Sequence, residues 1–286
     1  MLFNLALLAN LRQLESVVFV DNQITSIHPP QAAVVQNISA LDLSHNQLRY
    51  LNMTALASLK QLRILLITNN QLAAVGYGLR GVVAFPRLQT LDLSNNVLQS
   101  FSLEQLSAPS LEYLQLSFNE LSTVPGPLES FPKLTILALN HNALVSVSFA
   151  LFEGLHDLVS LELSQNRLQT LDATRALELP RLESLMLSAN QLQIVDLQKL
   201  TVPRLRTLDL SFNLLNYVPV VFENSMKSLQ LVTVMGNPLT CATLQAHRAY
   251  IRKEILIPKW LLSDKELCST GRVFVLNVKR RSCCTL

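Results

Sequence analysis

Residues 88–96 read LQTLDLSNN, and residues 205–213 read LRTLDLSFN. The same phrase, L-x-x-L-x-L-x-x-N with Leu or Ile usually two residues later, recurs along the chain. Its closing asparagines are separated by 24, 24, 26, 23, 23, 24, 24, 23 and 24 residues. A fixed period of this length indicates stacked structural repeats. These ladder asparagines are Asn22, Asn46, Asn70, Asn96, Asn119, Asn142, Asn166, Asn190, Asn213 and Asn237.

Each phrase predicts a short strand followed by a turn. Successive strand residues alternate sides, so the leucines five and three residues before the asparagine share one side, which we assign to the core. The asparagine falls at the turn, where its amide can both donate to and accept from buried backbone groups. One repeat cannot bury its leucines alone, so the repeats must stack and their strands form a parallel sheet. An amphipathic helical bundle would require ten coincidental asparagines.

The phrase resembles the leucine-rich repeat. This resemblance implies an α/β horseshoe solenoid with a parallel β-sheet on the concave face, an irregular or short-helical convex face and a disulfide-stapled C-terminal cap. We expect about ten repeats in residues 1–240, with residues 1–13 as the tail of a truncated upstream repeat. Residues 241–286 are then the cap.

Composition and charge fit an elongated core with a distinct end. The 286 residues are 49% hydrophobic and 15% charged, and no apolar run is long enough to span a membrane. Residues 1–240 hold 14 Lys and Arg against 17 Asp and Glu, whereas residues 241–286 hold 9 against 3. A basic end could contact an anionic surface, but it lacks an aromatic-and-basic binding motif. We therefore expect a structural cap.

The amino terminus resembles the middle of a repeat. Residues 8–14, LANLRQL, align without gaps with residues 56–62, LASLKQL. We expect a truncated chain whose signal peptide is missing. The alternative is a weak signal peptide built on residues 2–9, but that segment has no basic start and continues in repeat register.

All four cysteines lie in the last 46 residues: Cys241, Cys268, Cys283 and Cys284. Clustering at the end of a solenoid indicates disulfides that staple a cap. Adjacent cysteines are poorly placed to bond each other, so Cys283 and Cys284 are expected to pair with Cys241 and Cys268 in an order that the sequence leaves open. A zinc site would require paired cysteine spacings or nearby histidines, and only His247 is near.

Two acceptor sequences for N-linked glycans agree with an oxidising compartment. They are Asn37-Ile38-Ser39 and Asn52-Met53-Thr54. Both lie outside the strand phrase, where a glycan could project into solvent.

The order of one cysteine, a second about 26 residues later and then a double cysteine resembles the mosquito leucine-rich-repeat immune proteins. A helical-looking stretch, residues 242–256, follows the first cysteine as in that family. The resemblance implies a non-enzymatic, secreted factor of haemolymph whose partner is a complement-like, thioester-containing protein or another leucine-rich-repeat immune protein. Known members also use a coiled coil after the double cysteine. This chain ends two residues after Cys284, which puts heterodimerisation and capture of the thioester protein in doubt.

Two other functions remain open from the sequence. The chain could be the ectodomain of a cell-surface adhesion or recognition receptor, or an intracellular regulatory repeat protein with free thiols. Histidines in unrelated repeat phases and glycines without a phosphate-loop pattern give no support for an enzyme, and we expect no cofactor.

The expected binding surface is the exposed side of the concave sheet. Residues four before each ladder asparagine should face outward, and they include four carboxylates and no basic group, which favours a basic or mixed protein partner over nucleic acid. Apolar residues on the flank add an interface core. The alternative is a solvent face that binds nothing. The row is Val18, Asp42, Leu66, Asp92, Gln115, Ala138, Glu162, Met186, Asp209 and Thr233, with Ile64, Tyr113 and Ile136 on the flank.

Overall fold

The computed structural model describes residues 1–8, 10–29, 37–78, 81–173, 175–219, 226–259, 268, 270–277 and 279–285. The chain forms two compact units. The first unit comprises Met1–Leu144 and Leu151–Leu158, and the second comprises Val145–Ala150 and Val159–Leu286. The expected division at residue 240 stays a prediction.

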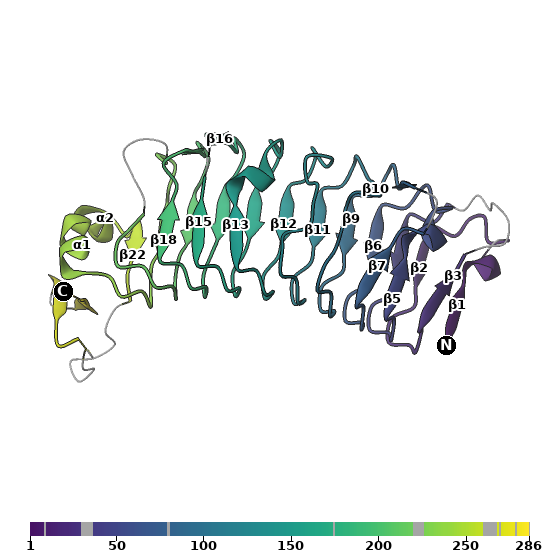
Figure 1. Ribbon diagram of the computed structural model, residues 1–286, viewed down its shortest axis with the longest axis horizontal. Helices are drawn as coiled ribbons and strands as arrows, with labels where there is room; N and C mark the ends of the chain where they lie inside the picture. The colour runs from purple at the N-terminus through teal and green to yellow at the C-terminus, as the bar shows by residue number, and fades with distance from the viewer. Residues whose placement is uncertain are drawn as a thin grey trace. The chain divides into compact units, whose positions relative to one another are not determined.

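The first unit is built on a parallel sheet with one short strand from each repeat (Figure 1). Neighbouring strands pair in register, so that Leu41 of one repeat lies beside Leu65 of the next and Leu65 beside Leu91. The strands follow in the order β2 (Ser16–Val18), β4 (Ala40–Asp42), β6 (Ile64–Leu66), β9 (Thr90–Asp92), β11 (Tyr113–Gln115) and β12 (Ile136–Ala138).

The second unit repeats this arrangement. Its strands are also parallel and in register, with Leu161 beside Leu185 and Leu185 beside Leu208. The order is β14 (Ser160–Glu162), β17 (Ser184–Met186), β20 (Thr207–Asp209), β21 (Leu231–Thr233) and β22 (Leu256–Ile257). The predicted parallel-strand solenoid of about ten turns is confirmed.

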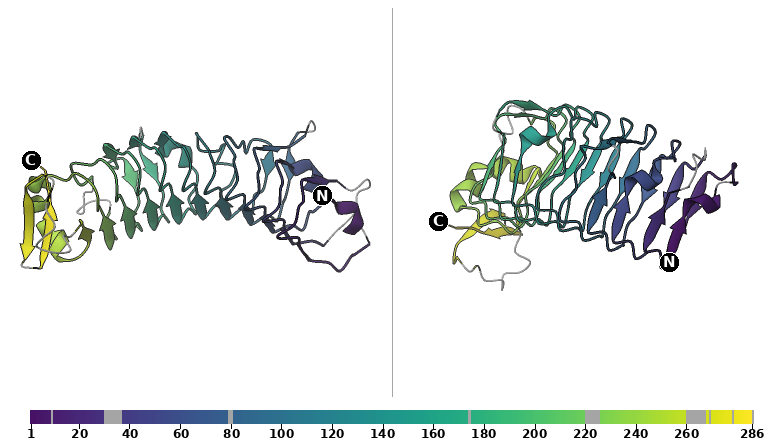
Figure 2. Two further views of the ribbon diagram at one scale, coloured as in Figure 1. Left: turned by 90° about the horizontal axis from the view of Figure 1, so that it is seen from below. Right: turned by 45° about the vertical axis from the view of Figure 1, so that its right-hand side comes forward.

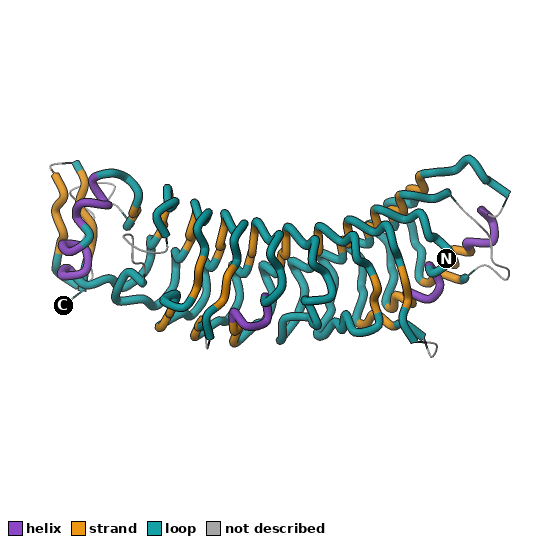
Figure 3. Tube along the Cα trace, turned by 90° about the horizontal axis from the view of Figure 1, so that it is seen from above, coloured by secondary structure: helices purple, strands orange, loops and turns teal. Residues whose placement is uncertain are grey.

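Shorter parallel pairings lie apart from these main sheets (Figure 2). In the first unit they are β1 (Leu2–Asn4) with β3 (Ser26–His28), β5 (Tyr50–Asn52) with β7 (Ala74–Gly76), and β8 (Val83–Ala84) with β10 (Leu106–Ser107). In the second they are β13 (Ser146–Ser148), β15 (Thr170–Asp172) and β18 (Ile194–Asp196) in one row, and β16 (Leu177–Glu178) with β19 (Leu200–Thr201). The repeats contain little helix (Figure 3). The described 3-10 helices are η1 (Leu5–Leu8), η2 (Met53–Leu56) and η3 (Phe149–Phe152).

The core is the leucine side of each strand phrase. Leu91 and Leu93 are fully buried, as are Leu208 and Leu210 at the same positions of a later repeat. Burying such a side chain stabilises the fold by about 1.5–3 kcal/mol relative to leaving it exposed. The expected core is therefore confirmed, and large aromatic side chains, among them Phe85 and Phe131, are buried with it.

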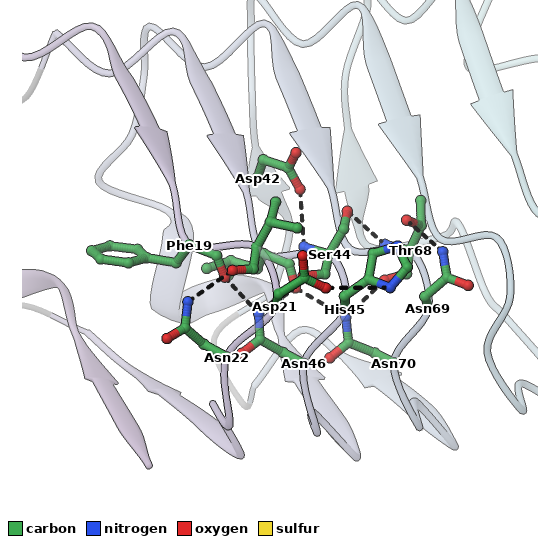
Figure 4. A network of polar contacts seen from close by, with 12 residues as sticks. Phe19, Asp21, Asn22, Asp42, Ser44, His45, Asn46, Thr68, Asn69 and Asn70 are labelled. Atoms are coloured by element: carbon green, nitrogen blue, oxygen red, sulfur yellow. Dashed lines mark hydrogen bonds and ion pairs between the residues drawn. The ribbon is translucent and has the colours of Figure 1, made fainter.

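The ladder asparagines join neighbouring repeats through their side-chain amides. Asn96 accepts the Leu72 N–H of the preceding repeat at 2.9 Å. Its Nδ2 donates to the Ile67 carbonyl of that repeat at 2.9 Å and to Leu93 of its own at 3.0 Å. Asn46 and Asn70 make the same type of contact (Figure 4). One buried side chain thus satisfies backbone groups of two repeats at once.

The residue before each asparagine adopts a left-handed backbone. Its N–H then donates to a carbonyl of the next repeat, as His45 does to Thr68 at 2.9 Å and Phe212 to Met235. Such φ values are uncommon outside glycine and unfavourable for bulky side chains. Where the adjacent asparagine is buried, as Asn46 and Asn213 are, its hydrogen bonds to two repeats compensate this cost.

The cap follows the last ladder asparagine. Thr240 caps α1 (Cys241–Ala246) by accepting the Thr243 N–H, and α2 (Arg248–Arg252) follows at once. The antiparallel hairpin of β23 (Val273–Asn277) and β24 (Arg280–Cys283) completes the cap. Disulfides join Cys241 to Cys284 and Cys268 to Cys283. The expected disulfide cap is confirmed, and the order left open by the sequence is now assigned.

One expectation for the cap is wrong. The helical stretch does not reach Leu256, because α2 ends at Arg252 and Leu256 lies in β22. The β22 strand pairs with β21, where Val232 N–H donates to Ile255 at 2.7 Å and Val234 N–H to Ile257 at 3.0 Å. An unpaired sheet edge exposes backbone donors and acceptors, so β22 satisfies groups that the end of the repeats would otherwise leave open.

We predict that Asn96→Leu destabilises the protein by at least about 2 kcal/mol, because it leaves the buried Leu72 N–H and the Ile67 carbonyl without partners and each costs about 1–3 kcal/mol. Urea unfolding followed by circular dichroism measures the change.

The matched control is Asn22→Leu. Asn22 is exposed and donates to Val20 of its own repeat, so its replacement should shift stability by about 0.5 kcal/mol or less. Equal unfolding midpoints for the two variants would contradict the proposed role of the ladder.

Candidate functional site

The nine residues expected on the binding surface fall into two groups. Six lie in the first unit. Asp42, Leu66, Asp92 and Gln115 are the third residues of adjacent strands and stand side by side in register. Tyr113 and Ile136 are the first residues of β11 and β12 and are likewise paired. We call the side of the main sheet that carries the first and third strand residues the sheet face.

The remaining three lie on the sheet face of the second unit. Glu162, Met186 and Asp209 are the third residues of β14, β17 and β20, and they are adjacent in register. Each unit thus brings its own group together as a continuous row.

Three of the carboxylates have a structural task that the sequence reading missed. Asp42, Asp92 and Asp209 each accept the N–H of the serine two residues later, at 2.9, 2.9 and 3.0 Å. Aspartate commonly stabilises turns by such a local bond. In the sequence, this local bond is indicated by the recurrent D-L-S motif at these positions. The carboxylates therefore shape the turn after the strand, besides carrying charge on the sheet face.

The Asp209 carboxylate accepts hydrogen bonds from two residues. Burial of its carboxyl group disfavours the charged form, but hydrogen bonds from the Thr233 hydroxyl and the Ser211 N–H outweigh this and lower its pKa. Asp209 therefore carries a negative charge at neutral pH. The hydrogen bond to Thr233 also joins β20 to β21 across the sheet face.

The apolar part of the sheet face is concentrated in the first unit. Ile64 is 40% exposed and Tyr113 is 38% exposed, while Leu66 and Ile136 are half-buried. Ala138 was expected to face outward, but only 1% of it is exposed. Its partner in register on the adjacent strand is the larger Gln115.

A chain of polar side chains runs beside this apolar area. Arg63 donates from Nε to Gln89 at 2.8 Å, and Gln89 donates from Nε2 to Glu112 at 3.1 Å. In the second unit, Arg206 and Glu183 form an ion pair at 3.3 Å at the equivalent repeat position. These residues directly precede the strands, a regularity that the sequence reading did not use. They give the apolar residues a polar border, as protein interfaces usually have.

The left-handed turn positions carry exposed aromatic groups that the sequence reading also missed. In the first unit, the rings of Phe118 and His141 are stacked with centroids 4.0 Å apart. In the second unit, Phe212 is 60% exposed and lies against Gly236, where an added Cβ would sit 2.6 Å from its ring. Glycine at 236 is therefore needed for this contact as well as for its positive φ.

The two glycan acceptors differ in their surroundings. Asn37 is exposed and donates from Nδ2 to the Arg12 carbonyl. Asn52 is half-buried at the end of β5, and its side chain accepts the Thr54 N–H to cap η2. The Thr54 hydroxyl in turn donates to the Tyr77 carbonyl.

The described residues contain no group of three or more His, Cys, Asp or Glu side chains that could hold a metal ion. A cavity of about 80 Å³ lies between the last repeat and the cap, where it is lined by Val234, Gly236, Leu239, Pro258 and Cys283 among others. Ligand pockets are usually several times larger. Among all the described residues, no helix has the length and apolar character needed to cross a membrane.

Comparison with known proteins agrees with this geometry. Family models described as leucine rich repeats match residues 12–72, 87–108 and 132–192. The chain is 32% identical to rat Tsukushi over 261 residues, which cover 89% of this chain and 66% of Tsukushi. It is 36% identical to mouse Podocan over 115 residues, or 40% of this chain and only 18% of Podocan.

A solved complex gives the same fold. Its description names Latrophilin 3, Unc5D and the leucine-rich repeats of FLRT2, and the match has a TM-score of 0.69 at 20% identity over 97% of this chain and 82% of that one. Repeat arrays of this kind provide extended surfaces for binding other proteins. The chain belongs to the leucine-rich repeat family, whose solenoids serve as protein-binding scaffolds.

Proposed function

We propose that this chain is a secreted, non-enzymatic factor of innate immunity that binds a complement-like, thioester-containing protein or another leucine-rich-repeat immune protein. The observation that carries a binding role is the sheet face of the first unit. The identity of the partner rests on the arrangement of Cys241, Cys268, Cys283 and Cys284, which resembles that of the mosquito immune proteins.

The sheet face has the chemistry of an interface core. Tyr113 and Ile136 are neighbours on adjacent strands, and Ile64 lies on the same row two strands away from Tyr113. Partly exposed aromatic and aliphatic groups bordered by polar side chains are typical binding anchors. The polar border is the Arg63, Gln89 and Glu112 chain.

The charge of the face favours a basic or mixed partner. Asp42 and Asp92 flank Leu66 in the first unit, and Glu162 and Asp209 flank Met186 in the second. The hydrogen bonds that Asp42, Asp92 and Asp209 accept from serine N–H groups come from uncharged donors, so they do not neutralise the carboxylates. A partner with complementary positive charge would associate faster at low ionic strength.

The cap supports an extracellular location. All four cysteines are paired, and none is free. Disulfides persist in oxidising compartments and are rare in the cytosol. The pairing therefore argues against the alternative of an intracellular protein with free thiols, and it is compatible with a secreted factor or a receptor ectodomain.

We predict that the purified chain recovers a thioester-containing protein from haemolymph, and that Tyr113→Ala with Ile136→Ala lowers its affinity at least about tenfold. Loss of two interface anchors typically costs more than the 1.4 kcal/mol that a tenfold change represents. Quantitative pull-down followed by mass spectrometry measures the recovery.

The control truncates two exposed apolar residues away from the sheet face. Val82 and Val97 are exposed residues of the first unit that lie outside the main sheet, so Val82→Ala with Val97→Ala should leave recovery unchanged. Failure to recover a thioester protein would exclude the proposed partner. Recovery that is equal for both double variants would exclude the sheet face as its binding surface.

We further propose that Asn37 carries an N-linked glycan and that Asn52 does not, because Asn37 is exposed whereas Asn52 is half-buried and caps η2. In protein secreted from insect cells, one glycan should be removed by glycosidase, and Asn37→Gln alone should abolish the mass shift. A shift abolished by Asn52→Gln, or a second glycan, would contradict this assignment.

A further inference from the structure

Positively charged side chains are concentrated in the cap. Arg252 and Lys253 end α2, and Lys279 and Arg280 form the turn and the start of β24. Arg252, Lys253 and Lys279 are exposed, and Arg280 is less so. We call these four residues the cap patch. They belong to a segment whose basic excess the sequence already shows, with 9 cations against 3 carboxylates in residues 241–286.

One ion pair brings the two halves of the cap patch together. Glu254, which follows α2, pairs with Arg280 of the hairpin. Arg252 and Lys253 immediately precede Glu254, and Lys279 immediately precedes Arg280, so this ion pair brings the backbone positions of the four cations to the same part of the cap. Glu254 offsets one of them. Among the described residues, no other carboxylate is within ion-pair distance of Arg252, Lys253 or Lys279.

The cap fixes the backbone segments that carry these charges. Arg248 donates to the carbonyls of Val275 and Leu276 at 3.1 and 3.0 Å and lies over the ring of Phe274, which fastens α2 along the edge of β23. The Asn277 side chain accepts the N–H groups of Lys279 and Arg280, both at 2.9 Å, which fixes the hairpin turn. The Cys241–Cys284 disulfide ties α1 to the end of β24. A backbone that is already fixed lowers the entropy cost of binding at these positions.

Stabilisation of a helix C-terminus does not by itself explain the cap patch. Basic residues near a helix C-terminus interact favourably with its dipole, which explains Arg252. However, α2 has only five residues, and its dipole is correspondingly small. Lys279 lies in the hairpin turn and has no helix to stabilise.

From this cluster we infer that the cap patch binds a sulfated polysaccharide. Clustered cations recognise linear polyanions by releasing their condensed counterions. The disulfides indicate an oxidising compartment, and the extended polyanions present in such compartments are sulfated glycans. Nucleic-acid sites commonly add exposed aromatic side chains for base stacking, whereas the exposed large apolar residues described in the cap are Val273 and Val275. The cap patch does not include Asp264, Lys265 or Glu266, which lie outside the described residues.

The test measures binding of a heparin-derived dodecasaccharide by isothermal titration calorimetry at several salt concentrations. The triple variant Arg252→Gln, Lys253→Gln and Lys279→Gln should bind at least about tenfold more weakly than the wild type and show a smaller salt dependence. Arg280 is kept intact, because its ion pair with Glu254 belongs to the fold. Unchanged thermal unfolding and an absence of free thiols check that the variant keeps its cap.

The matched control removes three cations from the first unit. Arg12, Arg87 and Lys133 are exposed, and their replacement by glutamine gives the same change in net charge. This control should retain wild-type affinity, and fully desulfated dodecasaccharide should bind neither form. Equal weakening of both triple variants, or no weakening of the cap variant, would overturn the proposal. So would equally tight binding of a DNA duplex at the same salt concentration, since it would show nonspecific attraction of polyanions.

Discussion

Every other feature of this protein depends on one interaction, the hydrogen bonding of a buried asparagine side chain to the backbones of two consecutive repeats. Asn96 accepts from one repeat and donates to both, and its neighbours in the ladder do the same. These bonds hold the repeats at the spacing at which their strands pair and their leucines bury one another. They also compensate the left-handed backbone of the preceding residue. A side chain with both a donor and an acceptor is required, so leucine could not replace it.

The sequence was sufficient to predict the elements that the repeat period controls. The spacing of Asn70, Asn96 and Asn119 located the strands, and the leucine positions located the core, because each repeat is a local unit that contacts chiefly its neighbours. Features that depend on a contact specific to one pair of segments were not predictable. The order of the disulfides, the pairing of β22 with β21 and the burial of Ala138 are of this kind. The turn role of Asp42 and Asp92 could have been predicted from the recurrent D-L-S, since aspartate often bonds to the N–H two residues later.

Some side chains of the candidate binding surface also stabilise the fold. Asp209 stabilises the turn after β20 and bonds to Thr233 of the next strand, while its charge contributes to the sheet face. Tyr113 and Ile136 have no comparable structural bond in their own side chains, so they are freer to serve a partner. At the cap, different residues have these two roles. Arg248 and the disulfides stabilise the cap, and the exposed cations of the cap patch are available for binding. A repeat scaffold can therefore carry two chemically different surfaces, one acidic and apolar, the other basic.

Hydrogen–deuterium exchange with residue resolution tests the central role of the ladder most directly. The N–H groups of Leu48, Leu72, Leu98 and Leu192 donate to ladder asparagines at 3.0, 2.9, 3.0 and 3.0 Å. If these bonds join the repeats, the four amides should be among the slowest to exchange and should approach the rate set by global unfolding. Exchange of these amides as fast as that of exposed turn residues would contradict the account, because the side chains would then not be holding the repeats together.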